Sequence, residues 1–401
     1  MLSLTDEKMT RILFVYHVSS VGGGSYCLLN LLKAIDRVMF DPVVLLPANG
    51  PLCDEIGKLG IDIVYFPALT LYPYNKSLWS VKTFRTLMRV EHCQKGFADI
   101  LRQVKPELVY FNTMMLFPYL QTAKEHGCKT VLHVREHWPL DEHKKQLNRA
   151  RKLVYKYADK LIAINRYSAS IFPKKEATIV YDWIDMEARR GGPNLMRLLG
   201  KVSSDVKVYL FTGGLQPIKG TIEVLDSFSH HINGDNKRLL VLGIDPVMEW
   251  NGFRGRVKKI LSLLGYKTYK EKIVNICKND KRIICVPSFY YITDLIEEVT
   301  GIVSYFNIPH ANLALAESII LGKPVVAAQT DESLEYSCEG SLALLYKFGS
   351  KKDFVNAWLS LEQGDLGLDE RLRKDSHKVA DKFSPIKNSE VFNGAIKNFF
   401  K

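Results

Sequence analysis

Two glycines and a nearby lysine lie where an apolar run of the sequence ends and an amphipathic stretch begins. The run ends in Gly213 and Gly214, and Lys219 follows at the start of the next predicted helix. Glycines let a ligand approach backbone N–H groups, and a lysine beside them can hold a phosphate as a point charge. The pattern predicts a phosphate site, with a solvated lysine in an ordinary turn as the alternative.

A carboxylate interrupts a later apolar helix. Glu317 lies within the stretch LALAESIILG. A carboxylate among apolar neighbours is costly to desolvate unless it is paired or hydrogen-bonded, and the hydroxyls of a ribose are suitable donors for it. An internal salt bridge or a partly exposed helix face is the alternative interpretation.

Three consecutive glycines, Gly22, Gly23 and Gly24, follow the first apolar run, Ile12–Val18, and open a helix. Their spacing differs from the GxGxxG of dinucleotide-binding proteins. A glycine loop before a helix N-terminus still favours an anionic ligand. We expect these glycines to lie near such a ligand; the alternative is that they only form a tight strand-to-helix turn.

These residues need a framework that brings them together. Short apolar runs alternate with longer amphipathic stretches almost from end to end, which indicates parallel sheets covered by helices on both faces. The pattern restarts after the polar segment Ala188–Ser204. We therefore predict an α/β protein of two doubly wound, Rossmann-like domains facing across a cleft. Their predicted bounds are 1–187 and 188–385, with a terminal helix at 386–401 that packs back on the first domain.

The composition limits the partners. A net charge of +12 favours an anionic partner: donor phosphates, a phosphorylated lipid, an anionic membrane surface or nucleic acid. No nucleic-acid-binding module is recognisable, so nucleic acid is not expected. The seven cysteines are scattered without a CxxC pair, which argues against disulfides and a metal site. No signal peptide or membrane-spanning apolar run is evident, so we expect a cytoplasmic protein.

Taken in order, the three motifs resemble those of the family 4 glycosyltransferases, which have the GT-B fold. That family has a Gly-Gly loop after its first strand, a G-R-L-x-x-x-K-G stretch opening its second domain, and E-x7-E followed by G-x-P-V-V-A. The resemblance runs from about Arg11 to Ala328. It implies that Lys219 contacts the donor diphosphate and that Glu317 binds the nucleotide ribose. The first glycine loop would lie near the donor phosphates and the acceptor.

The sequence departs from the family pattern at two positions. Gly214 replaces the arginine of G-R-L, so one phosphate-binding cation is missing unless another basic residue reaches in. Pro309 replaces the first glutamate of E-x7-E, which normally contacts the donor sugar. We expect His310, Asn312 and Leu313 to face the sugar and phosphates instead.

The first domain is altered at its catalytic position. The family commonly carries His-Asp after the strand that corresponds to KTVLHV, where this chain has Arg135 and Glu136, with His137 beside them. These three residues are too polar for a core, so we predict that they line the pocket and act in catalysis. The stretch Val180–Asp185 resembles the end of the family's first domain, with Asp182 and Trp183 in place of Asn-Gly.

The resemblance implies a retaining glycosyltransferase that needs neither metal nor cofactor. It would move a sugar from a nucleotide-sugar donor to a glycan or lipid-linked acceptor in cell-surface polysaccharide synthesis. Lys219 and the N–H groups of Gly213 and Gly214 would stabilise the charge that grows on the leaving phosphate. The alternatives are a nucleotide-sugar epimerase on the same fold and a nucleotide-sugar-binding protein that has lost catalysis.

Two basic segments of the first half are candidates for the acceptor side. Tyr72–Trp79 leads into a helix that carries Lys82, Arg85 and Arg89. Another predicted helix holds a run of basic residues, namely Lys144, Lys145, Arg149, Arg151, Lys152 and Lys156. Aromatic and basic side chains together suit a peripheral contact with an anionic membrane and a lipid-linked acceptor. An ordinary solvated helix face is the alternative.

Overall fold

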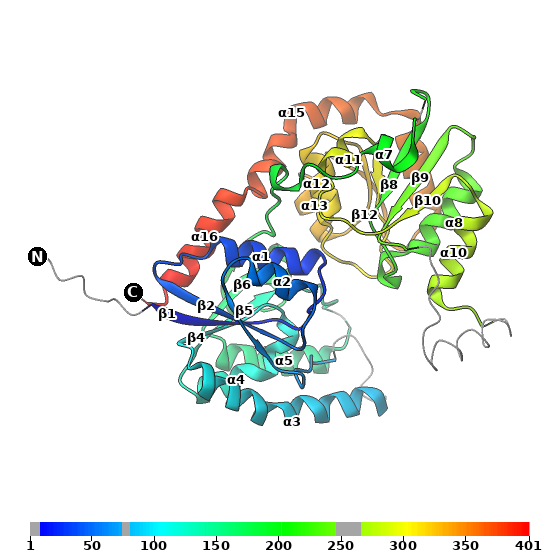
Figure 1. Cartoon of the computed structure of the whole chain (residues 1–401). Helices are drawn as coiled ribbons and strands as arrows, with labels where there is room; N and C mark the ends of the chain where they lie inside the picture. The colour runs from blue at the N-terminus through cyan, green and yellow to red at the C-terminus, as the bar shows by residue number, and fades with distance from the viewer. Residues whose placement is uncertain (1–8, 74–80, 141, 202, 246–265, 401) are drawn as a thin grey trace, which may run out of the picture. The chain divides into compact units, whose positions relative to one another are not determined.

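The computed structural model describes residues 9–73, 81–140, 142–201, 203–245 and 266–400. The chain divides into two compact units: unit 1 is Met1–Trp183 with Pro385–Lys401, and unit 2 is Ile184–Ser384. Each unit is built on a parallel sheet with helices on both faces (Figure 1), which confirms the predicted fold class. Among the described residues, no helix is long and apolar enough to cross a membrane.

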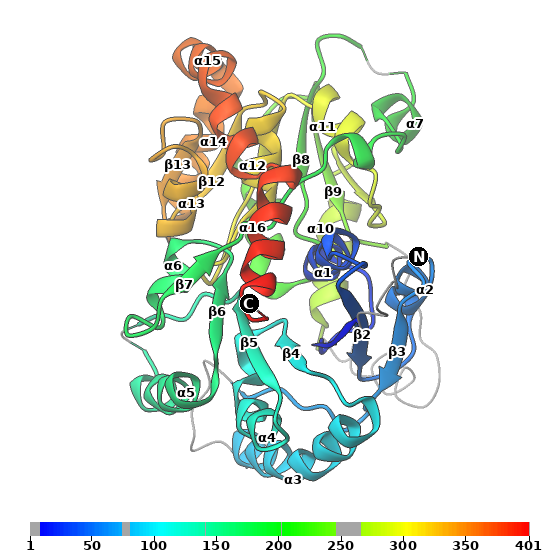
Figure 2. The same ribbon diagram turned by 90° about the vertical axis from the view of Figure 1, so that its left-hand side faces the viewer.

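Unit 1 contains a seven-stranded parallel sheet in the order β3-β2-β1-β4-β5-β6-β7 (Figure 2). Its strands are β1 Thr10–Val15, β2 Phe40–Leu46, β3 Asp62–Tyr65, β4 Leu108–Phe111, β5 Lys129–Val134, β6 Lys160–Ala163 and β7 Ala177–Ile179. Its helices are α1 Gly23–Ala34, α2 Pro51–Gly57, α3 Val81–Val104, η1 Met114–Tyr119, α4 Leu120–Glu125, α5 Lys144–Tyr157, α6 Arg166–Ser170 and α16 Pro385–Lys397.

The strands of unit 1 are apolar on both faces because both faces are covered. On β1, Leu13 and Val15 join the core under α3, α4 and α5, whereas Ile12 and Phe14 join the core under α1, α2 and α16. Alternate side chains of a strand point to opposite faces, so a continuous apolar run is the signature of a sheet buried on both sides. Figure 1 shows the two helix layers on either side of this sheet.

The last helix of the chain belongs to unit 1. On α16, Phe392 is fully buried in the core beneath α1 and α2. Asn393 accepts a hydrogen bond from the backbone N–H of Asp36 (3.1 Å) and donates one to the carbonyl of Ala34 (2.7 Å). The C-terminal segment therefore completes a core that the first part of the chain builds.

Unit 2 contains a six-stranded parallel sheet in the order β10-β9-β8-β11-β12-β13. Its strands are β8 Lys207–Phe211, β9 Lys237–Leu242, β10 Ile283–Val286, β11 Gly301–Val303, β12 Val325–Gln329 and β13 Leu344–Lys347. Its helices are η2 Glu187–Arg189, α7 Leu195–Leu199, η3 Pro217–Lys219, α8 Thr221–His231, α10 Tyr269–Asn279, α11 Thr293–Glu298, α12 Leu313–Ile320, α13 Asp331–Tyr336, α14 Lys351–Gln363 and α15 Leu366–Lys382.

The division between the units falls after Trp183, whereas we predicted a boundary after residue 187. Local hydrogen bonds explain the difference. The backbone N–H of Ile184 donates to the carbonyl of Phe383 (3.1 Å), and the hydroxyl of Thr293 donates to the carbonyl of Met186 (2.8 Å). Residues 184–187 are therefore fixed to unit 2.

Each sheet has one place where the strand order reverses: between β1 and β4 in unit 1, and between β8 and β11 in unit 2. Loops that leave the carboxyl ends of two such strands run to opposite faces and leave a crevice, where ligands of open α/β sheets bind. The loop after β8 carries Lys219, and the segment after β11 carries α12 with Glu317. The fold therefore brings these two sequence motifs to one switch point.

Candidate functional site

The loop after β8 has a backbone that excludes larger residues. A Cβ atom at Gly213 would lie 2.0 Å from the ring of Phe211. Gly214 has a φ of +59°, and a Cβ atom there would lie 3.3 Å from the carbonyl oxygen of Gly243. This left-handed conformation favours glycine. It gives a physical reason why this loop does not carry the arginine that the family pattern places at 214.

Lys219 ends η3, beside the loop that follows β11. Asn307 joins the two loops, because its backbone N–H donates to the carbonyl of Ile218 (2.9 Å) and its side chain donates to that of Pro217 (2.9 Å). The Nζ atom of Lys219 lies 4.4 Å from the centre of the Phe306 ring. In the described part of the chain it has no hydrogen-bond acceptor.

Burial lowers the pKa of Lys219 from 10.5 to about 8, and the negative charge of Glu317 offsets part of that effect. The interaction shows that the two side chains lie within electrostatic reach of each other. A partly buried ammonium with an aromatic ring beneath it and a carboxylate nearby can accept an anionic ligand. The site is therefore suited to a group that brings negative charge.

Glu317 is 7% exposed and forms an ion pair with Arg189 through its Oε1 atom. The structure thus contains the internal salt bridge that we considered as the alternative for this carboxylate. Its second oxygen, Oε2, has no hydrogen-bond partner among the residues that the structure describes. A carboxylate oxygen can accept two hydrogen bonds, so the ion pair leaves capacity for the hydroxyls of a ligand.

The other residues predicted for this site follow β11. The ring of His310 lies 5.9 Å from that of Phe306, on which Lys219 also rests. Asn312 caps α12: its side chain accepts from the N–H of Leu315 (3.4 Å) and donates to the hydroxyl of Ser304 (3.0 Å). Leu313 is the first residue of α12. Asn312 therefore has a structural function at the start of α12.

The glycine loop of unit 1 follows β1. A Cβ atom at Gly22 or Gly23 would meet nothing within 4 Å, whereas one at Gly24 would lie 2.9 Å from the Tyr16 hydroxyl oxygen. Gly22 is the N-cap of α1 and gives it no side-chain cap. Open space at the start of an uncapped helix is compatible with a ligand close to the backbone.

Arg135 follows β5 and forms a buried ion pair that its place in the sequence does not indicate. Its Nη2 atom lies 2.6 Å from Oδ2 of Asp182, and the two side chains are 10% and 11% exposed. Burial is the largest influence and lowers the pKa of Arg135, but the charge and hydrogen bond of Asp182, together with Cys27 and Tyr16, raise the pKa overall. Arg135 is therefore a permanent cation. The signal in the sequence was the aspartate at 182, where the family has asparagine.

Glu136 and His137 are also held within unit 1. Glu136 accepts hydrogen bonds from the hydroxyl of Thr113 and from the N–H of Met114 (3.0 Å). Burial raises the pKa of Glu136, and these hydrogen bonds partly offset the increase. The ring of His137 stacks on Tyr167 with centres 4.1 Å apart. Arg135, Glu136 and His137 thus reach the carboxyl edge of the sheet, and each already has a partner there.

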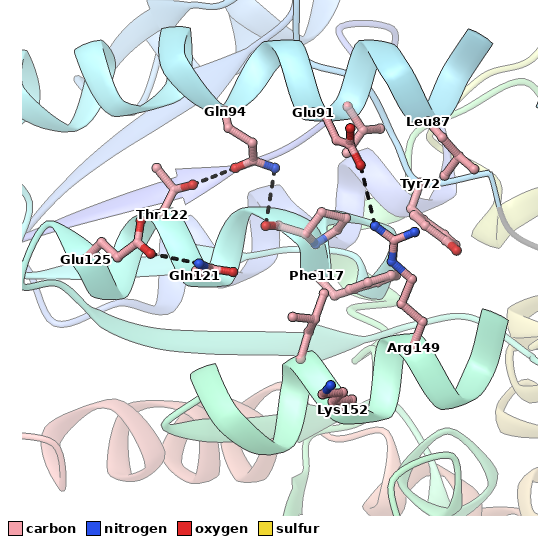
Figure 3. Close-up of a pocket in the computed structure, with 13 residues that line it drawn as sticks. Tyr72, Leu87, Glu91, Gln94, Phe117, Gln121, Thr122, Glu125, Arg149 and Lys152 are labelled. Atoms are coloured by element: carbon pink, nitrogen blue, oxygen red, sulfur yellow. Dashed lines mark hydrogen bonds and ion pairs between the residues drawn. The ribbon is translucent and has the colours of Figure 1, made fainter. Parts of the chain in front are cut away.

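A cavity of about 500 Å³ lies in the helix layer of unit 1 (Figure 3). It is lined by Tyr72, Leu87, Val90, Glu91, Gln94, Phe117, Pro118, Gln121, Thr122, Glu125, Arg149, Lys152 and Leu153. Of the two segments singled out in the sequence, the first contributes Tyr72 to the lining, and the second, on α5, contributes Arg149 and Lys152. Glu91 of α3 and Arg149 of α5 approach each other at 3.7 Å across it. Residues 74–80, which include Trp79, lie outside the described residues.

In the described ranges, no group of three or more His, Cys, Asp or Glu side chains is arranged to hold a metal ion.

The chain matches one known protein domain and is similar in fold to several solved structures. Residues 22–175 match the glycosyl transferase 4-like domain. The crystal structure of Anabaena HepE in complex with UDP and glucose covers 98% of this chain and 99% of its own, at 17% identity and a TM-score of 0.70. Sucrose-phosphate synthase from Thermosynechococcus elongatus covers the same shares of the two chains, at 12% identity and a TM-score of 0.67.

A Listeria monocytogenes protein assigned as a UDP-N-acetylglucosamine 2-epimerase is also similar, at 13% identity, with a TM-score of 0.60 and coverage of 98% of this chain and 97% of its own. The comparison with curated proteins gave no match. At these identities the solved structures show the fold, and the domain match in unit 1 agrees with it. The chain therefore has the GT-B fold, and its residues 22–175 match the glycosyl transferase 4-like domain, which confirms the resemblance read from its motifs.

Proposed function

We propose that the chain transfers a sugar from a nucleoside diphosphate sugar to a glycan or lipid-linked acceptor in cell-surface polysaccharide synthesis. One observation carries the proposal: Lys219 follows β8 and Glu317 lies on α12 after β11, the two strands at the switch point of unit 2, and the two side chains are close enough to interact electrostatically. A nucleoside diphosphate needs a cation for its phosphates and acceptors for its ribose hydroxyls. These two side chains offer that combination where ligands of such sheets bind.

The chemistry follows from the charge that must be stabilised. When the bond between the anomeric carbon and the diphosphate oxygen breaks, negative charge grows on the leaving phosphate. Lys219 and the N–H groups that open α8 supply fixed positive potential for it, so the proposed reaction uses neither metal nor cofactor. The diphosphate also favours the ammonium form of Lys219, against the burial that lowers its pKa. Retention of configuration is proposed from the family resemblance.

The acceptor side is proposed to lie on unit 1, against an anionic membrane surface. The first half of α3 exposes Val81, Phe84 and Met88, which are 67%, 60% and 52% exposed and spaced on one face of the helix. Arg85 and Arg89 are exposed on the same half of the helix. Exposed apolar residues among basic ones bind the interface of anionic bilayers.

The basic helix α5 supports the same proposal. It has six basic and no acidic residues between Lys144 and Tyr157, and it lies across the cavity from α3 (Figure 3). We propose that a lipid-linked acceptor reaches the protein from this side, and that the protein works in the cytoplasm at the membrane surface.

The donor is tested by titration calorimetry with UDP, GDP, ADP and their sugars. UDP and UDP-glucose come first, because UDP and glucose are bound in the similar HepE structure. We expect one nucleotide to bind, and Lys219→Ala and Glu317→Gln each to weaken it at least tenfold. Lys278→Ala, at an exposed position on α10, is the matched control and should bind as the wild type does. Unchanged binding in both site variants would disprove the assignment.

The membrane surface is tested by co-sedimentation with vesicles containing anionic lipid. The double variant Phe84→Ser with Met88→Ser should lose association. Leu366→Ser removes another exposed apolar side chain, 86% exposed on α15, and should have no effect. Equal sedimentation of the two variants would exclude α3 as the contact.

An epimerase is the second candidate, because a protein assigned to that activity shares the fold along the whole chain. The two activities differ in their need for an acceptor. Incubation of the bound nucleotide sugar alone, followed by NMR, should leave it unchanged if the chain is a transferase. Appearance of an epimer without any acceptor would favour the second candidate, whereas binding with neither reaction would indicate a protein that has lost catalysis.

A further inference from the structure

A strap formed by Met186–Leu195 runs across unit 2 and is fixed to α11. Arg190 donates to Asp294 (3.1 Å) and to Glu297 (2.7 Å), which lie one turn apart on that helix. The backbone N–H of Gly191 donates to Asp294 (2.7 Å), and that of Leu195 donates to Glu298 (2.7 Å). The strap therefore binds α11 through both side chains and backbone.

A close approach of two backbones adds to this anchoring. A Cβ atom at Gly192 would lie 1.7 Å from the carbonyl oxygen of Tyr291, so a larger residue at 192 would collide with the backbone. Arg189 stands between this contact and the hydrogen bond that Met186 receives from Thr293. Its position is therefore determined by anchors on either side of it.

The strap delivers the side chain of Arg189 to Glu317. The Nε atom of Arg189 donates to the carbonyl of Tyr290 (3.3 Å), and its guanidinium lies 5.5 Å from the centre of the Tyr290 ring. Its Nη1 atom pairs with Oε1 of Glu317, and the two side chains are 17% and 9% exposed. Desolvating such a pair costs about as much as the attraction returns, so stability alone is a weak reason for it.

The charge of a donor diphosphate gives a stronger reason for placing Arg189 beside Glu317. A diphosphate brings at least two negative charges, and the loop after β8 offers Lys219 but has Gly214 where the family pattern has an arginine. The guanidinium of Arg189 already contacts the carboxylate assigned to the ribose, which is bonded to the diphosphate. Arginine presents five N–H groups in a rigid fork, so it can hold a carboxylate oxygen and a phosphate oxygen together.

We propose that Arg189 is the second cation of the donor site, contacting the diphosphate in place of the arginine that position 214 lacks. The inference rests on the proposed function, since it requires a nucleoside diphosphate beside Lys219 and Glu317. Arg189 keeps its pair with Oε1 of Glu317, and Oε2 faces the ribose.

The test compares two ligands in the same protein sample. Titration calorimetry measures the affinities for the diphosphate that binds best among UDP, GDP and ADP, and for the matching nucleoside. Arg189→Gln should lower the ratio of diphosphate affinity to nucleoside affinity by about ten- to a hundredfold, the effect of losing a hydrogen bond to a charged group. Because both ligands meet the same sample, a partly unfolded variant leaves this ratio unchanged.

Arg190→Gln is the matched control, because it removes a neighbouring cation that pairs with Asp294 and Glu297, while Arg189 keeps its own anchors at Met186 and Gly192. Its ratio should equal that of the wild type. Two results would overturn the inference: an unchanged ratio in Arg189→Gln, which includes equal losses for nucleoside and diphosphate, or the same drop of the ratio in Arg190→Gln. If the wild-type protein bound none of the three diphosphates, the proposed function itself would fail. If instead the wild type bound a diphosphate and Arg189→Gln bound it equally well, only the inference about Arg189 would fail.

Discussion

Replacing Lys219 with methionine should stabilise the donor-free protein while abolishing donor binding. Burial lowers the pKa of this lysine from 10.5 to about 8. The folded protein therefore releases the proton of this ammonium group more readily than the unfolded chain does. Each pH unit between the two pKa values corresponds to about 1.4 kcal/mol, so the charge costs the fold about 3 kcal/mol at pH 7. Methionine keeps the length of the side chain and packs well on the ring of Phe306.

The sign of the pH dependence follows from the direction of this shift. Between pH 8 and 10.5 the unfolded chain binds the proton and the folded protein has released it, so the wild type gains stability as the pH rises. The cost is fully present below pH 8 and disappears above 10.5. The advantage of Lys219→Met should therefore be largest at neutral pH and should vanish near pH 10.5.

Scanning calorimetry of the donor-free chain at pH 7, 9 and 10.5 measures this effect. In a unit of about 200 residues, 1 kcal/mol changes the Tm by about 2–4 °C, so the Tm should rise by about 6–12 °C at pH 7. Lys219→Arg keeps the charge and should give no increase, and Lys278→Met should change nothing because position 278 is exposed. A Tm no higher than that of the wild type, or a difference that persists at pH 10.5, would refute the reasoning.

Three further predictions concern the same pKa and two buried contacts. Donor affinity should be constant below pH 8 and weaken about tenfold per pH unit above it, because protonated Lys219 is the binding form; calorimetric titrations that stay flat to pH 10 would contradict this. Asp182→Asn should destabilise unit 1 by about 3–5 kcal/mol, because it leaves the buried charge of Arg135 without its partner; a thermal scan with an unchanged Tm would speak against it. Phe392→Ala should cost about 3–5 kcal/mol through the cavity it opens, whereas Val391→Ala, 43% exposed, should cost much less; equal Tm values would show that α16 does not complete the core.

The fold was largely predictable from the sequence because its signals are local. A strand buried on both faces must be apolar throughout, and the helix that follows must be amphipathic, so their alternation indicates parallel sheets wherever it occurs. The loop at Lys219 was found for the same reason: a strand end, glycines and a helix start are neighbours in the sequence. The boundary after Trp183 was missed because it depends on hydrogen bonds to Phe383 and Thr293, which are distant in the sequence.

The partners of the charged residues were decided by the tertiary structure alone. The sequence indicated that Glu317 needs a partner. However, the residues around a carboxylate in an apolar helix do not show which cation will pair with it. Arg189 lies more than one hundred residues away, in the polar segment Ala188–Ser204, and only the strap along α11 brings it to Glu317. Likewise, the sequence predicted a catalytic role for Arg135 but did not indicate that Asp182 would pair with it. Residue type thus determined which chemistry was available, and the packing of distant segments determined which charges meet.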